Sequence, residues 1–156
     1  MNSFDALAWI GRWPFAFLPV YGARGLAAHL RRHAIQRALV SPLDAVFQPE
    51  PGPANRALLR ATRAVSNLVP VPVINPALAN WREELATCAA DPRVRAVRVL
   101  PNYHHWRLRG RAAGQLAEAL GRRGLRLIVQ TTLLHHREVQ QIRAERGIVQ
   151  LAVTFL

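Results

Sequence analysis

The sequence predicts an α/β fold of parallel strands, arranged as an incomplete (β/α)8 barrel of the TIM type. Short apolar runs alternate with longer amphipathic segments, and helix-stopping residues fall between them. The chain has 156 residues, fewer than the roughly 250 typical of a complete barrel. Because single helices between strands imply right-handed parallel crossovers, we expect about six strands and about five helices in one domain, residues 1–156.

Each apolar run has the length of a strand, and each segment between two runs has helical spacing. The expected strands are Phe4–Ile10, Ile35–Val40, Pro70–Ile74, Val94–Leu100, Leu125–Thr131 and Ile148–Phe155. The expected helices are Ala23–His33, Pro53–Val65, Ala79–Ala90, Arg109–Arg122 and Arg137–Arg146. Gly124 and Gly147 follow the last two helices, which is a common place for a helix to end.

The charge pattern is strongly basic but evenly spread. All 21 basic residues are arginine, and 9 acidic residues leave a formal net charge of +12. Such a charge attracts polyanions, yet the arginines are scattered along both halves of the chain, as a biased composition would also produce. Nucleic-acid binding is therefore only an alternative function, and we do not expect nucleic acid to be the main partner.

The sequence also predicts a cytoplasmic chain without a membrane span. Cys88 is the single cysteine, so no internal disulfide can form. The apolar start has no early basic region and carries Asp5 and Arg12, which argues against an export signal. No run reaches the roughly 18 uncharged apolar residues that a spanning helix needs.

Polar side chains follow the fourth expected strand, at the edge where active sites gather in parallel α/β folds. Asn102 and Tyr103 can donate and accept hydrogen bonds, which suits a substrate carbonyl or carboxylate. His104 can act as acid and base near neutral pH or bind a transition metal. The alternative is that these are loop residues bonded to backbone.

Three more candidates follow the fifth expected strand. His135 and His136 are candidate metal ligands with His104, and Arg137 is a candidate clamp for a substrate carboxylate. Asp5 lies in the first expected strand, where its carboxylate either has a structural partner or faces the barrel mouth as a catalytic group.

An ordered set of motifs resembles the amidohydrolase-related proteins, which are TIM-barrel hydrolases of the metal-dependent hydrolase superfamily. The resemblance covers about residues 4–132. Its markers are Phe4-Asp5-Ala6, Ile10-Gly11-Arg12-Trp13-Pro14-Phe15, Val40-Ser41, Val73-Ile74-Asn75-Pro76, Arg98-Val99-Leu100-Pro101-Asn102-Tyr103-His104 and Val129-Gln130.

The resemblance implies hydrolysis, or a related decarboxylation or hydration, of a small amide, lactone or carboxylate by a water on a divalent metal such as zinc or manganese. Metal-binding members carry His-x-His at the end of the first strand, where this chain has Leu7 and Trp9. Many members place a histidine after the fifth strand, where this chain has Gln130. The family is also similar to lactonases that work without metal.

Two functions follow from the residues and the resemblance together. One is an amidohydrolase-like hydrolase with an incomplete metal site, in which Asp5 and His104 are catalytic. The other is an inactive, truncated scaffold that binds a ligand or partner. The apolar run at residues 147–156 has no helix after it, so its strand would be uncovered, and we expect a homo-oligomer.

Overall fold

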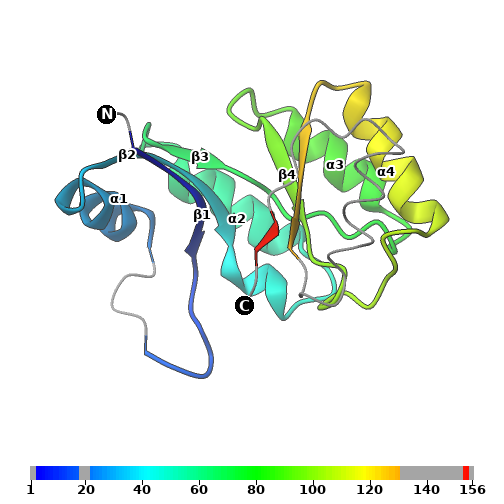
Figure 1. Cartoon of the computed structure of the whole chain (residues 1–156), viewed down its shortest axis with the longest axis horizontal. Coiled ribbons are helices and arrows are strands. Elements are labelled where there is room, and N and C mark those ends of the chain that lie inside the picture. The colour runs from blue at the N-terminus through cyan, green and yellow to red at the C-terminus, as the bar shows by residue number, and fades with distance from the viewer. Residues whose placement is uncertain (1–2, 18–21, 131–152, 155–156) are drawn as a thin grey trace.

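The computed structural model describes residues 3–17, 22–130 and 153–154, which form parallel strands with helices packed against them (Figure 1). The strands are β1 (Ser3–Ile10), β2 (Ile35–Pro42), β3 (Leu68–Pro70), β4 (Ala96–Val99), β5 (Arg126–Gln130) and β6 (Val153–Thr154). The helices are α1 (Ala23–Arg32), α2 (Gly52–Thr62), α3 (Trp81–Ala89) and α4 (Arg111–Gly121), with a 3-10 turn η1 (Leu43–Val46).

This arrangement confirms the predicted α/β fold. Four expected helices are present with ends within about two or three residues of those predicted, the usual uncertainty of helix ends. The fifth, expected at residues 137–146, lies outside the described residues. In the part of the chain that the structure describes, no helix is long and apolar enough to cross a membrane.

The strands pair in two parallel sheets, β1-β2-β3 and β4-β5-β6. An isolated parallel bridge between Val73 and Arg98 connects the two sheets. At this bridge the amide of Ile74 donates to the carbonyl of Arg98 over 2.9 Å, and the amide of Arg98 donates to Pro72 over 2.8 Å. The strands therefore follow one another in chain order, as in a barrel wall.

The third strand is shorter and earlier than predicted, because prolines interrupt its ladder. The expected strand ran from Pro70 to Ile74, whereas β3 ends at Pro70. Pro70 and Pro72 have no amide hydrogen, so neither can donate to a neighbouring strand. The chain beyond Pro70 still runs beside β4, but only as the single bridge at Val73.

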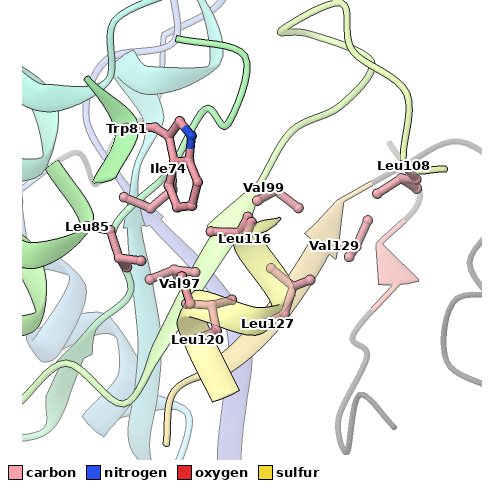
Figure 2. Close-up of a cluster of buried hydrophobic side chains, with 11 residues drawn as sticks. Ile74, Trp81, Leu85, Val97, Val99, Leu108, Leu116, Leu120, Leu127 and Val129 are labelled. Atoms are coloured by element: carbon pink, nitrogen blue, oxygen red, sulfur yellow. The ribbon is translucent and has the colours of Figure 1, made fainter. Parts of the chain in front are cut away.

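The two faces of β4 have different surroundings. Val97 and Val99 point toward α3 and α4 and belong to a buried apolar cluster with Leu85 and Leu116 (Figure 2). Ala96 and Arg98 alternate with these valines and therefore face the other side of the sheet, the barrel interior. Ala96 there packs with Val71, just after β3, and with Ile128 of β5.

Of the last expected strand, the structure describes only β6, which pairs with β5. The rest of the expected last strand lies outside the described residues.

Candidate functional site

The turn after β4 is held by backbone hydrogen bonds that place His104 at the C-terminal edge of the sheet. The amide of His104 donates to the carbonyl of Leu100 over 2.9 Å, and the amide of Trp106 donates to that of Pro101 over 3.1 Å. His105 has a φ of 53°, which reverses the chain and leaves its own side chain exposed. His104 is instead buried.

The buried His104 ring has one bonded nitrogen and one without a partner. Its Nε2 lies 2.9 Å from the carbonyl oxygen of Ala45, in the turn after β2. A carbonyl oxygen can only accept, so Nε2 carries the hydrogen and Nδ1 carries a free lone pair. Nδ1 is buried and has no hydrogen-bond partner among the described residues. The ring can therefore take up a proton at Nδ1.

Burial lowers the pKa of His104 below its ordinary value of 6.5, and the nearby His105 lowers it further. The bond to Ala45 works in the opposite direction, because it favours the charged ring, but burial is the larger effect. His104 is therefore neutral near pH 7, in the form that can act as a base.

Asn102 and Tyr103 lie on the same turn as His104. Asn102 is partly buried, and Tyr103 is 38% exposed. The structure thus brings these three predicted site residues together within one turn, at the edge where a substrate would enter a barrel.

Asp5 lies at a different level of the sheet. It pairs in register with Ala38 of β2, which lies four residues before that strand ends at Pro42. Ala38 and Pro42 are therefore about 13 Å apart along the strand. One oxygen of its carboxylate accepts from the amide of Leu7 over 2.8 Å, beside a register shift in β1. The carboxylate therefore supports a local irregularity of β1, and its predicted catalytic role stays a prediction.

His135, His136 and Arg137 lie outside the described residues. Their predicted metal-binding and carboxylate-binding roles stay predictions.

Two further polar residues, which the sequence patterns did not mark as site residues, lie buried on the inward face of the sheet. Arg98 is fully buried, and Gln130 is 3% exposed. In the described part of the chain, Nε and Nη1 of Arg98 and both polar amide atoms of Gln130 have no hydrogen-bond partner. A signal for Arg98 was available, since it is the one charged residue in the apolar run 96–100.

The described residues do not fit a divalent metal centre. Leu7 and Trp9 have no metal-ligating atoms, and the buried guanidinium of Arg98 repels a dication. In residues 3–17, 22–130 and 153–154, no group of three or more histidine, cysteine, aspartate or glutamate side chains could hold a metal ion. We therefore assign no step to a metal.

A small pocket opens beside the N-terminal ends of α2 and α3, at the same edge of the sheet. Its volume is ≈ 130 Å³, which is small for a ligand of drug size. Glu84 and Asn75 line it, and both already have hydrogen-bond partners within the chain. None of the predicted site residues that the structure describes lines this pocket.

No protein-family model matches the sequence, and no curated protein matches it either. Solved structures do match the fold. One is a probable 2-pyrone-4,6-dicarboxylic acid hydrolase from Acinetobacter baumannii with citric acid bound, at a TM-score of 0.68 and 16% sequence identity. Another is 5-carboxyvanillate decarboxylase from Sphingomonas paucimobilis, at a TM-score of 0.62 and 11% identity.

Both structures are TIM-barrel enzymes of the amidohydrolase superfamily. The matches cover 98% and 96% of this chain but only 58% and 57% of those chains. At these identities the likeness shows the fold, and it confirms the part-barrel architecture that the sequence predicts.

Proposed function

We propose that this chain is an amidohydrolase-like hydrolase that acts on a small amide, lactone or carboxylate, with His104 as its acid–base group. The observation that supports this most is the free lone pair on buried Nδ1, with Nε2 fixed by Ala45. The names of the solved structures, a hydrolase of a dicarboxylic acid and a decarboxylase of a carboxyvanillate, support the same broad chemistry.

The chemistry needs one proton to move twice. Nδ1 of His104 takes a proton from water as the water oxygen bonds to the substrate carbonyl carbon. The carbon–oxygen bond of a lactone, or the carbon–nitrogen bond of an amide, then breaks, and the proton passes from Nδ1 to the leaving atom. Throughout, Nε2–H keeps its bond to Ala45, which stabilises the ring while it is charged.

Asn102 and Tyr103 have the role of holding the substrate. Their side chains offer neutral donors and acceptors on the turn that carries His104. A substrate carbonyl bonded there would lie next to the base.

The test compares hydrolysis of a panel of lactones and amides by the wild type and two variants, with a chelator present. His104→Gln keeps a donor for Ala45 but removes the base, and it is expected to lower kcat/KM by about 10²–10⁴. His33→Asn is the matched control, because His33 is exposed and lies at the C-terminal end of α1, away from the turn that carries His104. Full activity of His104→Gln would overturn the proposal.

The second candidate is a scaffold that binds a ligand without turnover. Leu7 and Trp9 favour it, because they stand where the resemblance implies metal-binding histidines. It predicts that no lactone or amide is hydrolysed, while ligand binding still depends on the barrel interior.

A further inference from the structure

The charge of Arg98 is buried and incompletely compensated. Its side chain is fully buried, yet within residues 3–17, 22–130 and 153–154 only one of its five N–H donors, on Nη2, has a partner, the carbonyl of Ala6 at 3.5 Å. Within the described residues no carboxylate forms an ion pair with it. An isolated buried charge costs several kcal/mol, so a site of this kind is more stable with an anion present.

The guanidinium of Arg98 stays charged at neutral pH in spite of its burial. Burial lowers the pKa of Arg98 to about 10, and the negative charge of Asp5 limits the decrease. Arg98 therefore still carries a full positive charge at neutral pH. Asp5 acts at a distance and does not occupy the N–H donors.

The parallel register places a second unpartnered polar group on the same inward face. Arg98 pairs with Ile128 of β5, and Gln130 lies two residues further along that strand. The side chains of Ile128 and Gln130 therefore lie on the same face of the sheet as the side chain of Arg98. The amide of Gln130 can donate to an anion through its nitrogen. Its two polar side-chain atoms have no partner among the residues that the structure describes.

Trp9 fixes the plane of the guanidinium. The Cζ atom of Arg98 lies 4.3 Å from the centre of the Trp9 ring, a cation–π contact that covers one face. The N–H groups lie in the plane of the guanidinium, so this contact with its face does not use their hydrogen-bonding capacity. A planar fork of this kind matches a carboxylate, whose two oxygens also lie in one plane.

We propose that Arg98 and Gln130 form a buried binding site for a carboxylate or similar small oxyanion, in which the guanidinium is the cation of the barrel interior in place of a metal ion. This deepens the proposed function, because it names the acidic class of substrate or product that the barrel would hold. The site itself is testable without turnover.

The test is calorimetric titration of the full-length chain with citrate at constant ionic strength. We expect Arg98→Met to weaken citrate binding by at least about tenfold, which corresponds to about 1.4 kcal/mol. Arg95→Met is the matched control, because it removes the same charge from an exposed position just before β4 and is expected to bind citrate as the wild type does. Zinc chloride is expected not to bind at this site.

Three results would overturn the proposal. They are wild-type affinity in Arg98→Met, an equal loss in Arg95→Met, and no citrate binding by the wild type at millimolar concentration. If Arg98→Met does not fold by circular dichroism, Gln130→Leu replaces it, with a several-fold weaker affinity expected and an unchanged affinity counting against the site.

The two proposals fail separately. Citrate binding that depends on Arg98, without hydrolysis of any substrate, supports the oxyanion site and counts against the hydrolase. Hydrolysis that depends on His104, with citrate binding unchanged in Arg98→Met, supports the hydrolase and counts against the oxyanion site.

Discussion

Two buried polar regions of this chain differ in how completely they are bonded. The first, the seam between α2 and α3, has Asn55 at its centre, and the second is the inward face of the sheet with Arg98 and Gln130. Asn55 is fully buried, and its amide group exchanges two hydrogen bonds of 2.8 Å with the backbone of Val73. The same nitrogen also donates to Glu84 over 2.8 Å.

The seam continues from Glu84 to Cys88. The Cys88 thiol donates to Glu84 over 3.4 Å, and burial, followed by the charge of Glu84, raises the pKa of that thiol, so it stays protonated. The seam thus satisfies its polar groups internally, whereas the inward face leaves several without partners. The contrast separates polar groups that hold the fold from polar groups free to bind something else.

The largest expected effect is at the seam. Asn55→Ala would leave the amide and carbonyl of Val73 buried without partners, so we expect a loss of about 2–4 kcal/mol in the free energy of unfolding. Denaturant unfolding measures it. Asn80→Ala is the control, since Asn80 is exposed and makes no capping bond, and it should change stability by less than about 0.5 kcal/mol.

Arg98→Met is expected to change the free energy of unfolding in the opposite direction, or not at all. Removing an unpaired buried charge and filling its space with an apolar chain should leave the unfolding free energy unchanged or raise it by up to about 2 kcal/mol. The same denaturant experiment measures it. A loss comparable to that of Asn55→Ala would mean that Arg98 holds the fold, and the contrast between the two regions would fail.

The pH dependence of stability is a smaller effect. Because the pKa of His104 is lowered in the folded chain, the unfolded chain takes up a proton first as the pH falls. The contribution of His104 is therefore fully present above pH 6.5 and is lost as the pH falls from there through the lower folded pKa. His104→Gln should flatten this part of the stability profile, and an unchanged profile would contradict the assignment.

The smallest effect is expected at a partly exposed pair. The Arg93 side chain donates to both oxygens of Asp91 over 2.9 and 2.6 Å and lowers the pKa of that carboxyl below 3.8. Asp91→Asn should cost about 0.5–1 kcal/mol at neutral pH, and in the wild type this contribution should disappear as the pH falls below 3.8.

Glu118→Gln is the comparison for that pair, since Glu118 and Arg122 form an exposed ion pair at the C-terminal end of α4. Urea titrations of both variants should show no measurable change for Glu118→Gln. A larger loss of unfolding free energy in Glu118→Gln than in Asp91→Asn would show that the contribution of these ion pairs does not follow their burial.

The sequence by itself determined the alternation of strands and helices, because apolar periodicity and helix-ending residues are local signals. It also predicted the turn that carries Asn102, Tyr103 and His104, since those residues are adjacent in the chain. The early end of β3 also has a local cause in the sequence, because Pro70 and Pro72 lack the amide hydrogens that a longer strand would need.

Only the tertiary structure decided which polar groups are satisfied. The bond from His104 to Ala45 spans 59 residues, and it decides which ring nitrogen keeps its lone pair. Arg98 looked like one of many arginines, and its burial depends on strands that come together only in the folded sheet. Such contacts join residues far apart in the chain, so the periodic pattern of a local segment cannot predict them.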